Sequence, residues 1–186
     1  MAGLITGEGA TVDHTRVREA ETYLRRPRGT TYAGRRARYD AAADRLYAAG
    51  ISNTDILADV GAGWTELDVC LRVDWGWRGR YVPVDAWLDG VDLNQWTPPR
   101  SFDWFTALEV LEHLEEPERL VRTLQQHATK GVVVTTPNPQ VWDVLAMDPT
   151  HVCSISAATL QNWGFQTGLL TFYGKHEDGI IGLWTR

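Results

Sequence analysis

The chain has 186 residues, of which 44% are hydrophobic and 23% are charged, and its formal net charge at pH 7 is −6. This composition is typical of an ordinary soluble globular protein, and the length predicts one domain spanning residues 1–186. No apolar run approaches the roughly 20 residues that cross a bilayer, and the N-terminus lacks the basic and apolar regions of a signal peptide. The two cysteines, Cys70 and Cys153, form neither a disulfide framework nor a CxxC pair. We therefore expect a cytoplasmic protein with reduced thiols and no membrane partner.

Positive charge gathers near the N-terminus. Residues 14–47 contain nine arginines and four acidic residues, a local charge of +5 in a chain that is acidic overall. Such a segment could meet an anionic substrate. A solvated helical face in an arginine-rich protein is the simpler interpretation, because the chain has only two lysines.

Two helices are predicted ahead of the first strand. Apolar and charged residues mix with helical spacing over residues 15–26, and Pro27 ends this run. A second helix is predicted over residues 34–49. We take residues 1–33 as an N-terminal arm and helix, and residues 34–186 as the core of the domain.

From residue 55 onward, strand and helix patterns alternate along the chain. Short apolar runs of strand length alternate with amphipathic stretches, an order that predicts an α/β protein with a mainly parallel sheet. Two closing strands joined by a short turn predict an antiparallel hairpin at the end of this sheet. The expected elements, in chain order, are strand 55–60, helix 66–72, strand 80–85, strand 90–93, strand 101–108, helix 117–127, strand 130–136, helix 157–163 and the hairpin strands 168–173 and 179–185.

The most informative stretch is the glycine turn after the first predicted strand. Asp59, Gly61 and Gly63 end an apolar run, and Glu66 opens the next helix. In open α/β sheets such turns lie at the carboxyl ends of the strands, where ligands bind. A dinucleotide motif needs a third glycine at position 66, so that the helix N-terminus can meet a pyrophosphate. A carboxylate there would repel a pyrophosphate, so the pattern favours a cationic cofactor without phosphates.

Several features in motif order resemble the class I S-adenosylmethionine-dependent methyltransferases, over about residues 34–186. Residues 59–63 resemble the first motif of that family, and residues 102–113 resemble its fourth motif. The closing strand pair resembles the hairpin that distinguishes this family from dinucleotide-binding folds. The resemblance implies a Rossmann-like three-layer sandwich, with a mainly parallel seven-stranded sheet and an antiparallel C-terminal hairpin strand.

The resemblance also implies a site for S-adenosylmethionine at the strand ends. The glycine turn would approach the methionine part of the cofactor, Asp85 would bind the ribose hydroxyls, and Asp92 would lie near the adenine amine. Only residues 86–90 separate the second and third predicted strands, where the family usually has a helix, so the position of Asp92 departs from the pattern. The expected cofactor-binding residues are Asp59, Gly61, Ala62, Gly63, Trp64, Asp85, Asp92 and Glu109.

A group of acids and histidines follows the fourth predicted strand. Glu109, Glu112 and His113 are spaced so that a helical turn would place them on one side, at the carboxyl edge of the sheet. His151 comes after the next strand, in a loop long enough to fold over the site, and Asp148 is a weaker candidate beside it. The pattern resembles two branches of the family: ubiquinone-biosynthesis-type O-methyltransferases and small-RNA 2′-O-methyltransferases. The second branch places a metal on these four positions.

Three roles remain open for this group. Glu109, Glu112, His113 and His151 could bind a divalent ion (Mg, Mn or Zn) that lowers the pKa of a coordinated hydroxyl. One of the two histidines could instead accept the proton without a metal. The group could also be purely structural.

The sequence as a whole predicts methyl transfer from S-adenosylmethionine to an oxygen of a small molecule. The expected catalytic residues are Glu112, His113 and His151. A nucleic-acid substrate, held by the arginines of residues 16–45, is the first alternative, and the overall acidity argues against it. A non-catalytic protein that binds the cofactor, or nothing, is the second.

Overall fold

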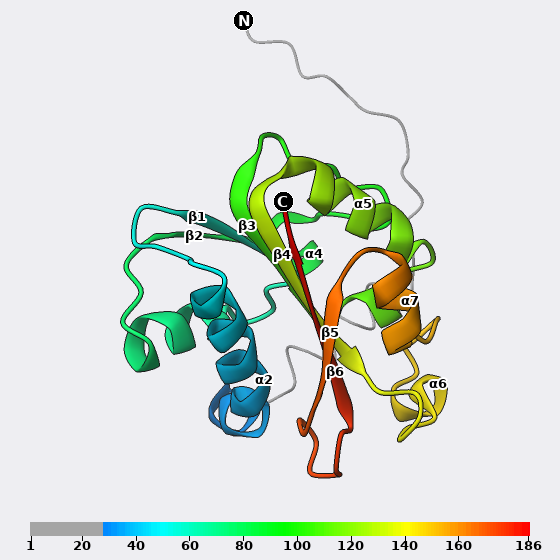
Figure 1. The fold of residues 1–186 in the computed structure, drawn as a ribbon. Helices are drawn as coiled ribbons and strands as arrows, with labels where there is room; N and C mark the ends of the chain where they lie inside the picture. The colour runs from blue at the N-terminus through cyan, green and yellow to red at the C-terminus, as the bar shows by residue number, and fades with distance from the viewer. Residues whose placement is uncertain (1–27) are drawn as a thin grey trace, which may run out of the picture.

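A six-stranded sheet with the strand order β2-β1-β3-β4-β6-β5 forms the centre of the protein (Figure 1). The computed structural model describes residues 28–186. Strands β1 to β4 run parallel, and β6 lies antiparallel to both β4 and β5. The predicted α/β fold with an antiparallel hairpin is therefore confirmed. The strands are β1 (Ile56–Val60), β2 (Arg80–Val84), β3 (Phe102–Leu108), β4 (Ala128–Pro137), β5 (Gln166–Leu170) and β6 (Gly179–Thr185).

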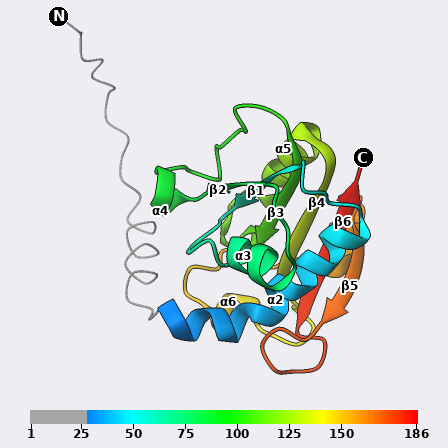
Figure 2. The same ribbon diagram turned by 90° about the vertical axis from the view of Figure 1, so that its left-hand side faces the viewer.

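Helices cover both faces of the sheet. The long helix α2 lies on one side, and α5 and α7 lie on the other (Figure 1). Figure 2 shows α2 beside α3, which continues into the π-helical turn η1. The helical elements are α2 (Arg28–Ala48), α3 (Glu66–Val69), η1 (Cys70–Asp74), α4 (Ala86–Asp89), the 3₁₀ turn η2 (Leu111–His113), α5 (Pro117–His127), α6 (Val144–Met147) and α7 (Ala157–Asn162).

Each face of the sheet has its own hydrophobic core, because successive side chains of a strand point to opposite faces. In β1, Leu57 packs into the core beneath α2, whereas Ala58 and Val60 pack into the core beneath α5 and α7. Asp59 shares the Leu57 face by the same alternation. The sequence therefore places this acid on the α2 side, at the carboxyl end of the strand.

The predicted strand at residues 90–93 is wrong. After β2 the chain forms the short helix α4 and then a turn, in which the backbone N–H of Asn94 donates to the carboxylate of Asp92 at 3.0 Å. Asp side chains favour such turns because they can accept from the backbone two residues on. The described sheet therefore has six strands instead of seven. Strand β2 is its edge, a position that tolerates Pro83.

Other boundaries also differ from the prediction, those of α2 and β5 among them. Helix α2 begins at Arg28 and not at residue 34, since Gly34 lies within the helix, where a glycine costs only about 1 kcal/mol. Strand β5 spans Gln166–Leu170, earlier than the predicted 168–173. The helix predicted over residues 15–26 lies outside the described residues. No helix within residues 28–186 has the length and apolar character needed to cross a membrane.

The hairpin turn between β5 and β6 is organised by one buried acid. The carboxylate of Asp178 accepts the backbone N–H groups of Phe172, Tyr173 and Lys175 at 2.6, 3.0 and 2.7 Å. The backbone carbonyl of Asp178 accepts the N–H of Asn138 at 3.0 Å, which ties the turn to the end of β4. Phe172 and Tyr173 therefore bend away from the sheet, although their residue types favour a strand.

Replacement of Asp178 by alanine should destabilise the protein by about 3 kcal/mol, because buried backbone donors would lose a charged acceptor. The free energy of unfolding from urea titration measures this loss. The matched control is Asp44→Ala, since Asp44 is exposed on α2. Equal stability of the two variants would show that the turn does not depend on the Asp178 carboxylate.

Candidate functional site

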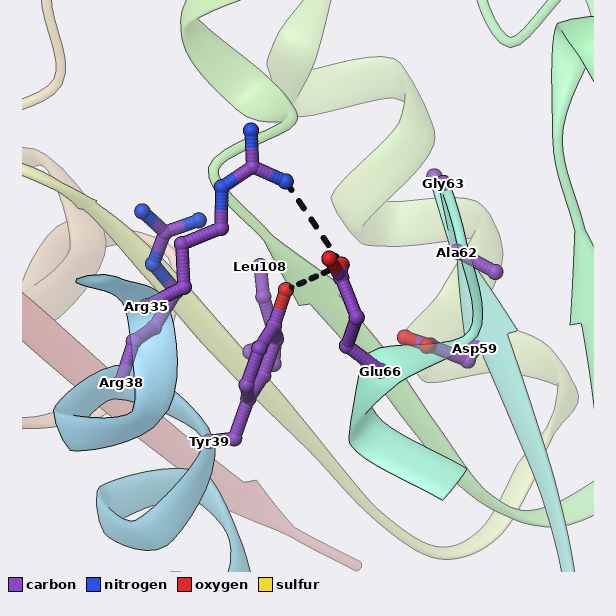
Figure 3. Close-up of a pocket in the computed structure, with 9 residues that line it drawn as sticks. Arg35, Arg38, Tyr39, Asp59, Ala62, Gly63, Glu66 and Leu108 are labelled. Carbon is purple, nitrogen blue, oxygen red and sulfur yellow. Dashed lines mark hydrogen bonds and ion pairs between the residues drawn. The ribbon is translucent and has the colours of Figure 1, made fainter. Parts of the chain in front are cut away.

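A small pocket opens at the carboxyl ends of β1 and β3, beneath helix α2 (Figure 3). The glycine turn after β1 forms one side, and side chains from α2 and α3 form the other. This is the sheet edge at which the sequence predicts a ligand. The pocket is lined by Arg35, Arg38, Tyr39, Asp59, Gly61, Ala62, Gly63, Glu66 and Leu108.

The glycine turn has a shape that other residues would not adopt easily. Gly61 and Gly63 have φ angles of 74° and 51°, in the left-handed region that favours glycine. A Cβ added at Gly61 would lie 2.3 Å from Cγ2 of Val110, so a side chain there would collide with the segment after β3. The backbone N–H of Gly63 donates to the carboxylate of Asp85 at 2.8 Å. The turn therefore leaves the backbone bare toward the pocket and holds Asp85 beside it.

Asp59 joins three strands beneath the pocket. Its buried carboxylate accepts the hydroxyl of Thr106 on β3 at 2.6 Å and the hydroxyl of Tyr81 on β2. Burial raises the pKa of Asp59 to about 6, although both hydrogen bonds act in the opposite direction. Asp59 therefore lines the bottom of the pocket as a neutral acid below about pH 6 and as a carboxylate above it.

Helix α2 contributes side chains that the sequence interpretation did not assign to the site. The hydroxyl of Tyr39 donates to Glu66 at 2.8 Å, and Nη1 of Arg35 lies 3.6 Å from the same carboxylate (Figure 3). Arg38 is only 8% exposed and also lines the pocket. For Arg38 the interpretation as a solvated helical face is wrong. The spacing of Arg35, Arg38 and Tyr39 in the sequence could have indicated that these side chains lie together, since residues three and four apart share one helix face.

The other expected cofactor residues lie around the turn with different degrees of contact. Trp64 is half-buried within the turn, and Ala62 is buried in the pocket wall. Asp85 is half-buried at the end of β2. Asp92 lies in the turn after α4, outside the residues that line the pocket. Its adenine-binding role stays a prediction.

The acid–histidine group forms a cluster of three residues. Candidate ligand atoms of Glu112, His113 and His151 all lie within 4.8 Å of one another. The rings of the two histidines meet edge to face, with centroids 4.7 Å apart. Glu109 is not among the three, because the chain after β3 is not an α-helix. Glu109 has a φ of 58°, and only the short 3₁₀ turn η2 follows it, so its side chain turns toward Arg38.

Hydrogen bonds define which ring nitrogen of each histidine carries the proton. Nδ1 of His151 lies 2.6 Å from the carbonyl oxygen of Val144, so this nitrogen is the donor. Nδ1 of His113 lies 2.9 Å from the hydroxyl of Thr150, which itself donates to Asp148 at 2.7 Å. The Thr150 oxygen therefore accepts from His113. In the neutral form of each ring, Nε2 is therefore the nitrogen with the lone pair, which a metal ligand or a general base needs.

Glu112 is the unusual member of the cluster. Its carboxyl group is fully buried, and neither oxygen has a hydrogen-bond partner among residues 28–186. Burial, together with the nearby Glu109 carboxylate, raises the pKa of Glu112 to about 8. A buried polar group without a partner is costly, so its retention indicates a ligand. One carboxylate and two imidazoles form a donor set that fits a divalent transition metal.

Replacement of Asp59 by asparagine should change how stability depends on pH. Because the pKa rises from 3.8 to about 6 on folding, the folded chain binds more protons than the unfolded chain between these values. Stability from this group is therefore present at low pH and falls as pH rises through about 6. Relative to Asp59→Asn, the wild-type protein should lose about 2 kcal/mol of unfolding free energy between about pH 4 and pH 7.

Urea denaturation at the two pH values measures this change. The control is Asp44→Asn, which removes an exposed carboxylate from α2. If the difference between wild type and Asp59→Asn stays constant with pH, Asp59 titrates normally and the assignment is wrong.

Comparisons with known proteins give likenesses in structure alone. No protein-family model and no curated protein matches the chain. The magnesium protoporphyrin IX methyltransferase of Synechocystis PCC 6803, solved with S-adenosylhomocysteine, is 16% identical, with 97% of this chain and 90% of that one covered and a TM-score of 0.53. An S-adenosylmethionine-dependent methyltransferase of Mesorhizobium loti is 15% identical, with 80% and 100% covered and a TM-score of 0.56.

A third likeness comes from Haloferax volcanii. A chain from the complex of the Trm112 methyltransferase activator with a methyltransferase is 10% identical, with 94% of this chain and 98% of that one covered and a TM-score of 0.65. At these identities the likeness concerns the fold. Together with the strand order and the terminal hairpin, it shows that the chain has the fold of the class I S-adenosylmethionine-dependent methyltransferases.

Proposed function

We propose that this protein transfers a methyl group from S-adenosylmethionine to an oxygen of a small molecule, and that the acid–histidine cluster activates this oxygen. The observation that carries the proposal is the buried, unpartnered carboxyl group of Glu112 between two histidines. A purely structural cluster would leave this carboxyl without a favourable partner.

The chemistry of the pocket supports S-adenosylmethionine as the cofactor. Asp59 and Glu66 bring two carboxyl groups to a wall that also holds Arg35 and Arg38, and this balance of charge suits a cofactor with a cationic sulfonium and no phosphates. The bare backbone of the turn allows close approach of a chain-like ligand at Gly61 and Gly63. In this proposal Asp85, whose carboxylate accepts the backbone N–H of Gly63, also accepts hydrogen bonds from the ribose hydroxyls.

The protein contributes to the reaction mainly by alignment. The acceptor oxygen attacks the methyl carbon as the bond from carbon to sulfur breaks, so oxygen, carbon and sulfur must lie in line. Nε2 of His113 or His151 can accept the proton that leaves the acceptor hydroxyl. A divalent metal held by Glu112, His113 and His151 would lower the pKa of that hydroxyl. In either case Glu112 and the two rings act on the same proton.

The surface beside the cluster favours a small, partly apolar acceptor over a nucleic acid. Helix α6 abuts the cluster through the hydrogen bond from His151 to Val144. Leu145 and Met147 on this helix, and Val152 beside His151, expose their apolar side chains. Nucleic-acid binding needs cations on the surface that meet phosphates, whereas Arg35 lies 3.6 Å from the Glu66 carboxylate and Arg38 is buried.

Binding of the cofactor is the first test. Isothermal titration with S-adenosylhomocysteine should show saturable binding at one site per chain. Gly61→Val should abolish this binding, because its side chain would occupy the space of Val110 and disturb the turn. Gly34→Val is the control, since a side chain at that position on α2 meets nothing within 4 Å and its backbone is not in the left-handed region. Absence of binding to the wild-type protein would contradict the proposed function.

The role of the cluster needs a separate test. Replacement of both Glu112 and His151 by alanine should reduce methyl transfer at least about a hundredfold, which is typical for loss of acid–base catalysis, and should leave binding of S-adenosylhomocysteine intact. Elemental analysis after dialysis against Mn²⁺ or Zn²⁺ should find metal in the wild type and not in the double variant. The control is His176→Ala, because the His176 side chain is 89% exposed.

Two results would change this assignment. Unchanged methyl transfer in the double variant would make the cluster structural. Full wild-type activity with chelator, and no bound metal after exposure to saturating ion, would remove the metal and leave a histidine as the base.

A further inference from the structure

We propose that Lys175 and Tyr173, both positioned by Trp142, select the methyl acceptor, and that this acceptor is a phenol with one negatively charged group. The inference rests on the proposed function, because it names the substrate class of the same reaction. None of the three residues lines the pocket of the glycine turn.

The three side chains lie at the end of the sheet that carries the site. Trp142 follows β4, and Tyr173 and Lys175 belong to the turn of the β5–β6 hairpin. Both views show this turn and the neighbouring helix α6 at that end (Figure 1 and Figure 2). Arg38, which lines the cofactor pocket, donates to the hydroxyl of Tyr173 at 3.5 Å. Trp142 comes just before α6, the helix to which His151 is hydrogen-bonded.

The chain fixes Trp142 and Tyr173 against each other. Their ring centroids lie 6.2 Å apart with an interplanar angle of 86°, the edge-to-face arrangement that aromatic rings favour. The backbone N–H of Trp142 donates to the carbonyl oxygen of Asn138, and that of Tyr173 donates to the carboxylate of Asp178, both at 3.0 Å. The side-chain amide of Asn138 donates to the carbonyl oxygen of Glu177 at 2.7 Å, which joins the two segments. The aromatic pair is therefore organised before a ligand binds.

Lys175 adds a cation that has no carboxylate partner. Its Nζ lies 3.5 Å from the ring centroid of Trp142, which is a cation–π contact. The other lysine of the chain, Lys130, pairs with Asp55 at 2.7 Å, whereas Lys175 makes no ion pair within residues 28–186. Because Lys175 is exposed, its ammonium group is held over the ring and remains open to an anion.

A single cation suits one negative charge better than a polyanion. Nucleic-acid binding needs several cations that follow the phosphates. Here Asp143, next to Trp142 in the chain, and Glu177, in the same turn as Lys175, are both exposed. These carboxylates would repel further phosphates, so the charge at this edge favours a small monoanion.

The surroundings of the cation favour an aromatic body with a phenolic hydroxyl. Tyr173 is 38% exposed, and Leu145 and Met147 on α6 also expose apolar side chains, so a ring can pack beside the aromatic pair. A phenolic hydroxyl has a pKa of about 10, whereas that of water is about 15.7 and an aliphatic alcohol resembles water. A phenol is therefore the easier acceptor to activate, whether by a histidine or by a metal ion.

Three small probes separate these features. The first, 4-hydroxyphenylacetate, has the aromatic ring, the hydroxyl and the negative charge. The second, 4-methylphenol, lacks the charge, and the third, 4-hydroxycyclohexylacetate, lacks the aromatic ring. Isothermal titration into the full chain saturated with S-adenosylhomocysteine should show that the first binds at least about tenfold more tightly than the other two.

Variants of the three residues assign each contribution. Lys175→Met should weaken binding of 4-hydroxyphenylacetate about tenfold and leave that of 4-methylphenol within about twofold, because only the acid meets the ammonium group. Tyr173→Leu should weaken binding of both phenols, whereas Tyr173→Phe should keep it, because the ring remains. Trp142→Leu should lower the affinity for the acid, and Trp142→Phe should restore it, because an aromatic ring again positions Lys175.

His176→Ala is the matched control, because this neighbour of Lys175 has a side chain that is 89% exposed. It should bind all three probes as the wild type does. Unchanged affinity for S-adenosylhomocysteine in every variant shows that the cofactor site is folded.

Equal affinity of the wild type for 4-hydroxyphenylacetate and 4-methylphenol, or no binding of either, would overturn the inference and leave the proposed function standing. Equal loss of both phenols in Lys175→Met would overturn it as well. Failure of the wild-type protein to bind S-adenosylhomocysteine would overturn the proposed function itself.

Discussion

The buried hydrogen bonds of Asp59 are the interaction on which the site depends. Its carboxylate accepts from Thr106 on β3 and from Tyr81 on β2, so one side chain joins three parallel strands at their carboxyl ends. These strand ends carry the glycine turn, Asp85 and the Glu109–His113 segment. Burial removes the carboxylate of Asp59 from water, which raises its pKa. The rest of the fold offsets the cost of burying this group directly under the pocket.

The end of β3 divides the site into two parts. The left-handed backbone of Glu109 turns that side chain toward Arg38, whereas the following 3₁₀ turn directs Glu112 toward the two histidines. Glu109 and Glu112 therefore serve different neighbours, although they are only three residues apart.

Helix α2 supplies the positive charges that balance the carboxylates of the pocket. Arg35 pairs with Glu66, and Arg38 lies against Glu109, so the helix brings two cations over a region rich in carboxyl groups. Part of the positive charge of the N-terminal segment therefore lies next to carboxylates of the site inside the protein. Charge counting along the sequence detects the excess but does not show which face of the helix meets the body.

The sequence by itself determined the α/β fold, the terminal hairpin and the sheet edge at which the candidate pocket lies, because apolar periodicity, two glycines and Asp59 are local signals. It failed at residues 90–93, where Asp92 turn chemistry outweighed a short apolar pattern, and at Glu109, where helical spacing did not apply. The expected convergence of Glu112, His113 and His151 is found, but only the tertiary structure decided that Glu109 turns away from them and that Arg38 lines the pocket. Arg38 and Glu109 are 71 positions apart in the chain, so packing, and no local pattern, brings them together.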